Sequence, residues 1–300
     1  MIAQIRRWLG SASPHTPFGI GDDCAVVPAS GRAQLITVDP VIYGEHFDDN
    51  VPPRAAGAKL LKRNLSDIAA MGGRPRAAVI ALALDGRVKT QWLESFYRGL
   101  AAEARRFCVP IVGGDIARHK GGIVATLTLV GEAAGRRVLT RRGAKPGDWI
   151  YVTGTLGGSL RGHHHRFIPR LSEGAWLAAR PEVRALMDVS DGVARDVRAL
   201  TPTGSVPHLI EAAIPISAAA RAESRRTGRS ALAHALGDGE DYELLFVVNE
   251  RANRTRFEAA WRKCFRTRLT CLGRFQRSGK VAGDGALNLS HHHGYEHLTA

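Results

Sequence analysis

The sequence predicts a two-domain protein of the mixed α/β class. Its 300 residues are enough for about two domains. Short β-branched runs alternate with longer segments whose apolar residues recur at helical spacing, which is typical of this class. A basic stretch with few apolar residues, 136–148, interrupts the alternation. We therefore expect an N-terminal domain over 1–140 and a C-terminal α/β domain over 141–300.

The N-terminal half alternates strand and helix signals. Pro52 and Pro53 precede a segment of helical periodicity, and Gly72 and Gly73 follow it, so a helix is expected between them. A second segment of the same periodicity carries Trp92 on its apolar face. The expected elements are, in order, strands 24–27 and 35–38, helix 55–71, strand 77–84, helix 91–107, and strands 109–112 and 123–132.

The C-terminal half is expected to open with a strand over 149–153, because this β-rich run leads directly into the glycine-containing turn 154–158. Shorter amphipathic and β-rich segments follow it. The expected helices are 173–179, 192–200, 217–226 and 251–264, and the expected strands are 186–189, 206–210 and 243–248.

The composition is that of a globular protein without a membrane partner. Apolar residues make up 44% of the chain and charged residues 23%, which excludes a disordered or fibrous protein. The longest clean apolar stretch, 77–84, is far shorter than the ~20 residues of a membrane helix. The N-terminus has no apolar core of signal-peptide length. We expect a cytoplasmic protein.

The basic excess has two interpretations. The chain has 42 Lys and Arg against 28 Asp and Glu, a formal net charge of +14, which can indicate a nucleic-acid partner. However, the basic residues are scattered in isolated pairs, and no run of five like charges occurs. We favour a dispersed arginine surface and expect no nucleic acid.

Cysteine and histidine do not indicate a metal or redox site. The four cysteines share no CxxC spacing and are expected to be free, mostly buried thiols. Two triple-histidine runs, 163–165 and 291–293, lack the spaced ligands of a zinc site and are expected in surface loops. The cysteines are Cys24, Cys108, Cys264 and Cys271.

Acidic residues fall at an unusual set of positions. Most lie in turns at the expected ends of strands, several beside glycines, where a single Asp is ordinarily a turn former or helix cap. Asp67 is harder to explain in that way, because it lies in the middle of an expected helix, where Asp has poor propensity. The set comprises Asp22, Asp23, Asp39, Asp67, Asp115, Asp188, Asp191, Glu240 and Asp241.

Such acids indicate magnesium if they converge. Carboxylates gathered in one cleft repel one another unless cations neutralise them. Oxygen ligands without Cys or His select Mg²⁺, which usually acts together with substrate phosphates. The chain contains no Walker A motif, no dinucleotide-binding turn and no protein-kinase catalytic loop. A nucleoside triphosphate would therefore be held mainly by metals and by backbone amides in glycine turns.

Long segments that occur in order along the chain resemble the thiamine-monophosphate kinase family, in the aminoimidazole-ribonucleotide-synthetase-like superfamily. They are GIGDDCAVV (19–27), NLSDIAAMGGRPRAA (64–78), GGDIAR (113–118), RRGAKPGDWIYVTGTLGGS (141–159), MDVSDGVARDV (187–197) and GDGEDYELLF (237–246).

The resemblance implies a two-domain α/β (α+β) fold. The N-terminal mixed-sheet domain would pair with its copy in a homodimer, the sheets joining into a barrel. It also implies transfer of the ATP γ-phosphoryl group to thiamine monophosphate with several Mg²⁺ ions, and leaves a K⁺ requirement open. The acceptor phosphate is already ionised, so no dedicated catalytic base is needed.

The resemblance also implies residue roles, matched position by position. Arg141 would clamp a phosphate, and Tyr295 and Glu240 would face the thiamine heterocycle. The metal-site residues would be Asp22, Thr37, Val38, Asp39, Asp67, Asp115, Asp188 and Asp191. ATP would meet Gly114, Asp115, Arg141 and Ser190, and the phosphorylated substrate would meet His46, Glu240 and Tyr295.

Several positions depart from the family pattern: Val38, Tyr43, Glu45, Ile116 and Ala117. They cluster near the implied metal and substrate residues. Val38 replaces a hydroxyl residue, which matters only if the metal is bound by a side chain there. The alternatives are another ATP-dependent small-molecule kinase or synthetase of the same superfamily, and a catalytically silent or basic binding protein.

Overall fold

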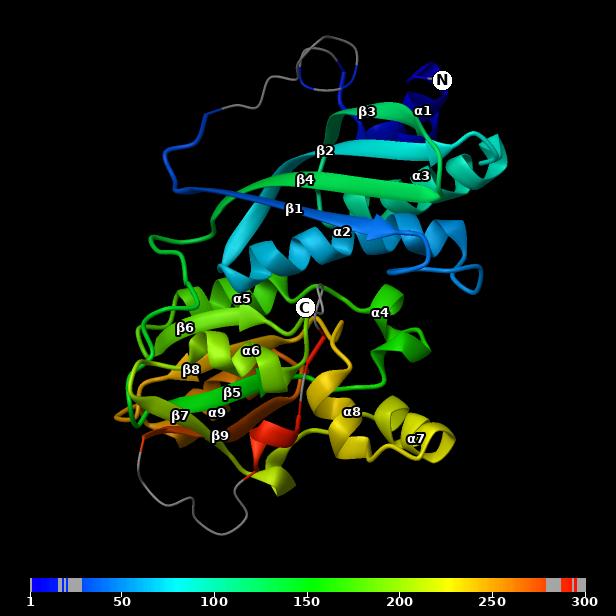
Figure 1. Cartoon of the computed structure of the whole chain (residues 1–300). Coiled ribbons are helices and arrows are strands. Elements are labelled where there is room, and N and C mark those ends of the chain that lie inside the picture. The colour runs from blue at the N-terminus through cyan, green and yellow to red at the C-terminus, as the bar shows by residue number, and fades with distance from the viewer. Residues whose placement is uncertain are drawn as a thin grey trace. The chain divides into compact units, whose positions relative to one another are not determined.

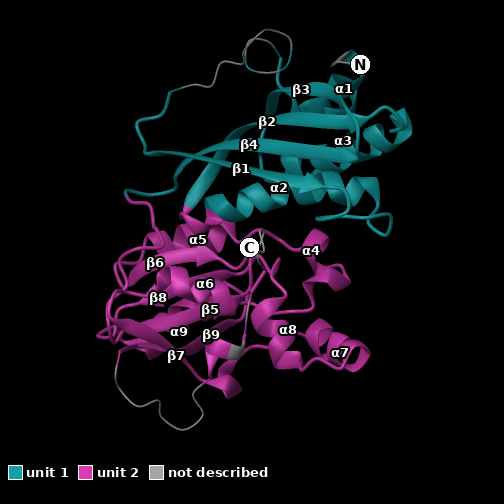
Figure 2. Ribbon diagram, in the orientation of Figure 1, with its two compact units in different colours: residues 1–68, 73–136 teal, residues 69–72, 137–300 magenta. Residues whose placement is uncertain are grey.

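The computed structural model describes residues 2–15, 18, 20, 29–278, 287–292 and 294–295. It confirms a mixed α/β protein with two sheets (Figure 1). The chain divides into two compact units (Figure 2). Unit 1 comprises 1–68 and 73–136, and unit 2 comprises 69–72 and 137–300.

Unit 1 is built on a four-stranded sheet of order β1-β4-β2-β3. The pair β2 and β3 is parallel, and the other two pairs are antiparallel. Its main elements are α1 (Ile2–Leu9), β1 (Gln34–Ile42), α2 (Pro53–Ala70), β2 (Gly73–Asp85), α3 (Thr90–Arg106), β3 (Ile111–His119) and β4 (Ile123–Ala133).

Helices α2 and α3 cover one face of this sheet (Figure 1). They approach each other closely, since a Cβ on Gly57 of α2 would lie 2.0 Å from the carbonyl oxygen of Phe96 in α3. The other face is open, and Ile36 and Val38 of β1 are 76% and 58% exposed there. Because side chains alternate along a strand, Thr37 and Asp39 lie on the helix-covered face.

Unit 2 is built on a five-stranded antiparallel sheet of order β6-β8-β5-β9-β7. Its strands are β5 (Trp149–Thr153), β6 (Val183–Asp188), β7 (Ser205–Leu209), β8 (Leu244–Val248) and β9 (Leu269–Arg277). Its helices are α4 (His163–Arg166), α5 (Leu171–Ala178), α6 (Val193–Leu200), α7 (Ala218–Thr227), α8 (Ala231–Gly237) and α9 (Arg254–Cys264).

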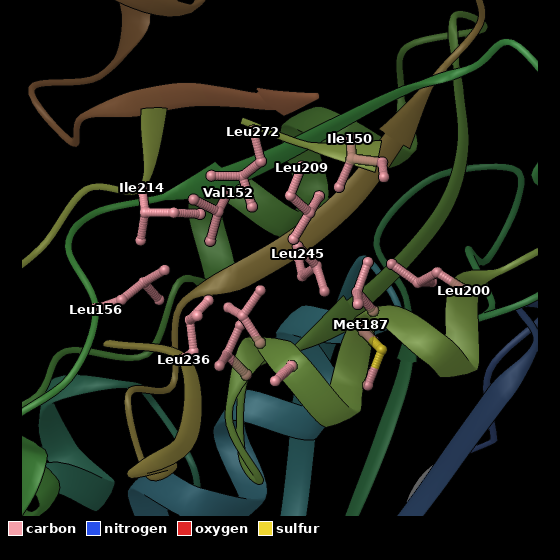
Figure 3. Packing of buried hydrophobic residues seen from close by; sticks show 14 of the residues in the cluster. Ile150, Val152, Leu156, Met187, Leu200, Leu209, Ile214, Leu236, Leu245 and Leu272 are labelled. Atoms are coloured by element: carbon pink, nitrogen blue, oxygen red, sulfur yellow. The ribbon is translucent and has the colours of Figure 1, made fainter. Parts of the chain in front are cut away.

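The sheet of unit 2 is buried on both faces. Ile150 and Val152 of β5 belong to one core cluster, which Figure 3 shows together with residues of α6 and α8. Tyr151, between them, belongs to a second cluster with Trp261 of α9. Two-sided burial explains why β8 is apolar at every position instead of alternating.

The structure extends two strands beyond their predicted ends. The expectation that Asp39 and Asp115 follow strands is wrong, because β1 runs on to Ile42 and β3 to His119. Strand β3 tolerates Gly113-Gly114 because, among the described strands, it lies at the edge of the sheet and pairs with β2 only. The predicted strand 24–27 lies outside the described residues.

The expectation of mostly buried thiols is wrong for the cysteines that the structure describes. Cys108 and Cys264 are exposed, and Cys271 is half-buried. Cys24 lies outside the described residues. Within the described ranges, no helix is both long and apolar enough to cross a membrane.

Candidate active site

In unit 1, helix α2 holds strand β1 through charged side chains. The Thr37 hydroxyl donates to Oδ2 of Asp67 at 2.5 Å. One turn earlier on α2, Arg63 lies 3.5 Å from Oδ1 of Asp39 and donates to the Pro40 carbonyl at 2.7 Å. These contacts explain an acid in the middle of a helix, since its carboxylate serves the neighbouring strand.

One turn further back, Lys59 fixes the loop that carries His46. Lys59 is fully buried, and its Nζ donates to the His46 carbonyl at 2.7 Å. The backbone N–H of Ile42 donates to Nδ1 of His46 at 3.2 Å. An acceptor at Nδ1 places the proton of a neutral ring on Nε2. Residues 59, 63 and 67 thus form one stripe at i, i+4 and i+8.

Asp115 is separated from these acids across the sheet. The strand register forms one row from Asp39 through Leu127 and Ile80 to Gly114. At ~4.8 Å per strand, this row spans roughly 14 Å. Since Mg–O bonds are about 2.0–2.1 Å, one ion cannot bind both Asp39 and Asp115 of the same chain.

Glycine is required at position 114. Its φ is +158°, and a Cβ there would lie 2.1 Å from the Ile80 carbonyl oxygen. The close approach of β3 to β2 excludes a larger residue. Asp115, one position along the strand, pairs with Ala81 and is exposed.

Three more residues that the sequence singles out precede α2: Val38, Tyr43 and Asp22. Val38 presents its side chain to the open face, so only its backbone carbonyl could serve a metal on the side of Asp39. The hydroxyl of Tyr43, one of the departures, donates to Asp49 in the same loop. Asp22 lies outside the described residues.

In unit 2, backbone hydrogen bonds bring four predicted residues together. The Glu240 N–H donates to the Ser190 carbonyl at 2.8 Å, and the Tyr295 N–H donates to the Asp191 carbonyl at 3.0 Å. Asp188 is the last residue of β6, two positions before Ser190. The predicted nucleotide and substrate residues of this unit therefore share one set of turns.

These turns are strongly acidic. The Asp191 N–H donates to Oδ2 of Asp196, a buried residue of α6. Burial and the charges of Asp188 and Asp191 raise the pKa of Asp196 to about 8, and Arg141 opposes the rise. Asp196 is not among the residues predicted from the sequence, although it lies within the segment 187–197 that carries the resemblance. Arg141 is close enough to Asp196 to act on its carboxylate electrostatically.

The side chains gathered in each unit are of the chemical type that binds Mg²⁺. The residues brought together are carboxylates and hydroxyls, which are hard oxygen ligands. Among the residues that the structure describes, no group of three His, Cys, Asp or Glu side chains is placed to hold one ion. Within each unit the described side chains alone therefore do not complete a metal site, and bound phosphate oxygens would have to supply further ligands.

A hollow elsewhere in unit 1 contains none of the predicted residues. It has a volume of about 580 Å³ and lies between α1, α3 and the start of α2. Glu94 is the one carboxylate among its lining residues, so the hollow does not match the acidic site that the sequence predicts. Its lining residues are Gln4, Arg7, Trp8, Arg54, Thr90, Glu94, Arg98 and Arg105.

Comparison with known proteins decides the family. Residues 21–133 match the model for the N-terminal domain of AIR synthase related proteins. The thiamine-monophosphate kinase of Rhodopirellula baltica is 37% identical over 245 residues, which cover 78% of this chain and 77% of that protein. The chain belongs to the thiamine-monophosphate kinase family.

Solved structures of the thiamine-monophosphate kinase family share the fold. The enzyme of Stenotrophomonas maltophilia K279a has a TM-score of 0.77 and 30% identity, with 95% of each chain covered. A structure described as AaThiL complexed with AMPPCP and TMP also has a TM-score of 0.77, at 29% identity, covering 93% of this chain and 92% of that one. The family and fold expected from the sequence are confirmed.

Proposed function

We propose that this chain phosphorylates thiamine monophosphate to thiamine diphosphate with ATP, by direct in-line transfer assisted by several Mg²⁺ ions. The observation that carries the proposal is the contact of Ser190 and Asp191 with Glu240 and Tyr295. The contact joins one residue expected at ATP and one expected at the metals to two expected at the acceptor, which supports the proposal. A relative has been solved with AMPPCP, an ATP analogue, together with TMP.

In this proposal, the chain positions anions and performs no covalent step. The metals would be held by Asp22, Thr37, the Val38 carbonyl, Asp39, Asp67, Asp115, Asp188 and Asp191. When bound, Mg²⁺ neutralises the charge on the phosphates. Arg141 would clamp an ATP phosphate, and Gly114, Asp115 and Ser190 would also contact ATP. Nε2–H of His46 is a suitable donor to the acceptor phosphate, whose ionised oxygen needs no base.

The proposal is tested by a coupled assay of ADP release with ATP, Mg²⁺ and thiamine monophosphate. We expect turnover that depends on all three. Turnover with another phosphate ester but not with thiamine monophosphate would favour a different superfamily kinase. Salt-sensitive binding of RNA or DNA without ATP turnover would indicate a basic binding protein instead.

Glu240→Ala is expected to raise the KM for thiamine monophosphate by about 10-fold to 100-fold, the value of a hydrogen bond to a charged group. The KM for ATP should change much less, because only the heterocycle faces Glu240 in the proposal. Steady-state kinetics with each substrate varied in turn make the comparison. Equal effects on both KM values would contradict the substrate assignment.

We also propose a homodimer formed through the open face of the unit 1 sheet. Ile36, Val38 and Val79 share that face, as the pairing of Val38 and Val79 with Thr128 shows, and all three are exposed apolar residues. An exposed apolar face of this kind is typical of an interface.

The substitution Ile36→Lys is expected to convert the dimer to a monomer, because it places a charge on the proposed interface. Light scattering after size-exclusion chromatography measures the mass. Leu160→Lys, at a similarly exposed position in unit 2, is the matched control and should leave the mass unchanged. A dimer that persists in Ile36→Lys would contradict this interface.

A further inference from the structure

The first histidine run packs against the turn that carries Glu240. Residues 163–165 begin helix α4, so the expectation of a surface loop is wrong, and His164 is only 7% exposed. The ring of Phe167, just after the helix, stacks on that of Tyr242 with centroids 4.1 Å apart. The second run, 291–293, lies partly outside the described residues.

Both oxygens of the Glu240 carboxylate have partners in this cluster. The Tyr242 hydroxyl donates to Oε1 at 3.1 Å. Nδ1 of His164 lies 3.6 Å from Oε2, which is ion-pair distance. Nε2 of His164 in turn lies 3.2 Å from Nδ1 of His165.

One arrangement of protons satisfies all of these contacts with neutral rings. His165 donates from Nδ1 to Nε2 of His164, and His164 donates from Nδ1 toward Glu240. The donors of Tyr242 and His164 are then both directed at the Glu240 carboxylate, and His165 holds the His164 ring in the tautomer that donates to it. The 3.6 Å contact between Nδ1 of His164 and Oε2 of Glu240 can shorten to a hydrogen bond when substrate binds.

The backbone of this turn is held in an uncommon conformation. Glu240 and Tyr242 have φ values of +53° and +51°, in the left-handed region that non-glycine residues rarely adopt. His163 supports the residue between them, since its Nε2 lies 3.2 Å from the Asp241 carbonyl oxygen. Non-glycine residues in this region persist only where their surroundings fix them, commonly at binding sites.

We propose that His164 is a positioning residue that fixes the orientation of the Glu240 carboxylate as a hydrogen-bond acceptor for the substrate. The recognised group would be a cationic or amine-bearing heteroaromatic ring, because an ionised carboxylate accepts hydrogen bonds and attracts positive charge. The inference rests on the proposed function, in which Glu240 faces the thiamine heterocycle. It assigns a specificity role to a histidine run that has no zinc-site pattern.

The test compares three substitutions at position 164. His164→Leu removes the donor and keeps the bulk, and is expected to raise the KM for thiamine monophosphate about 5-fold to 20-fold. The kcat and the KM for ATP should stay within about twofold. His164→Asn, whose amide nitrogen lies near the Nδ1 position, should restore the KM to within about threefold. His164→Gln, whose amide lies further out, should not.

A double-mutant cycle separates positioning from packing. In the Glu240→Gln background, His164→Leu should change the KM for thiamine monophosphate by less than about twofold, because the carboxylate charge that His164 positions is already absent. Calorimetric titration of thiamine monophosphate without ATP provides a binding readout for the same variants. Arg166→Ala, an exposed position on the same helix, is the control and should leave the KM unchanged.

Each outcome has one meaning. Equal KM changes in the two backgrounds, or a parallel rise in the KM for ATP, would overturn the role of His164 while leaving the proposed function in place. No turnover of thiamine monophosphate by the wild type would overturn both. If His164→Leu does not fold, His164→Gln runs the same cycle with the same expected loss.

Discussion

Asp67→Asn is expected to lower kcat/KM by roughly 10³-fold, about 4 kcal/mol, while the protein stays folded. The amide oxygen of Asn can still accept the Thr37 hydroxyl, so the contact between α2 and β1 survives. What is lost is the negative charge that would hold a cation against the phosphates. The ADP-release assay, run as a titration with Mg²⁺, measures both the rate and the Mg²⁺ concentration that it requires.

Glu94→Gln is the matched control for this charge change. Glu94 lies on α3 and forms an exposed i,i+4 ion pair with Arg98, which is worth little to stability. We expect wild-type kinetics from Glu94→Gln and melting temperatures within a few degrees for both variants. Wild-type kinetics from Asp67→Asn would contradict a site that depends on several metals.

Local patterns predict those elements of the fold that carry clear local signals. The strand 149–153 has its predicted bounds, because a β-rich run ends at glycines. Helix α8 was missed because it is short, although Ser230 is a usable signal: its hydroxyl accepts the Ala233 N–H as an N-cap. Strand β9 was missed because Arg, Gln and Gly interrupt its apolar residues. Its pairing with β5 and β7 stabilises it all the same.

In the candidate site, too, some residues can be predicted from local sequence and others depend on long-range contacts. Asp67 could be singled out locally, because an acid in the middle of an apolar helix needs an explanation. The contact of Ser190 with Glu240 could not be found locally, since it joins positions fifty residues apart through backbone atoms that carry no residue-type signal. Only the resemblance to a family placed them in one site. The contacts of Lys59, Arg63 and Asp196 depend on the register of packed elements, which periodicity does not specify.

Arg170→Met is expected to lower the free energy of unfolding by about 3–5 kcal/mol, because it leaves the buried carboxylate of Glu243 without its cationic partner. Arg170 donates to both carboxylate oxygens of Glu243, at 2.8 and 2.6 Å. The Thr153 hydroxyl donates to the same carboxylate at 2.6 Å, and Glu243 is 3% exposed. The pair joins the segment before α5 to the start of β8, next to the turn that carries Glu240.

Denaturant unfolding followed by circular dichroism measures this loss, and the melting temperature should fall by roughly 10 °C. The double variant Arg170→Met, Glu243→Met should recover much of the stability, since it removes the stranded charge together with its partner. Arg98→Met breaks an exposed pair of the same residue types and should cost less than about 1 kcal/mol. If Arg170→Met costs no more than Arg98→Met, solvent reaches the Glu243 carboxylate, and the pair does not fix the turn beside it.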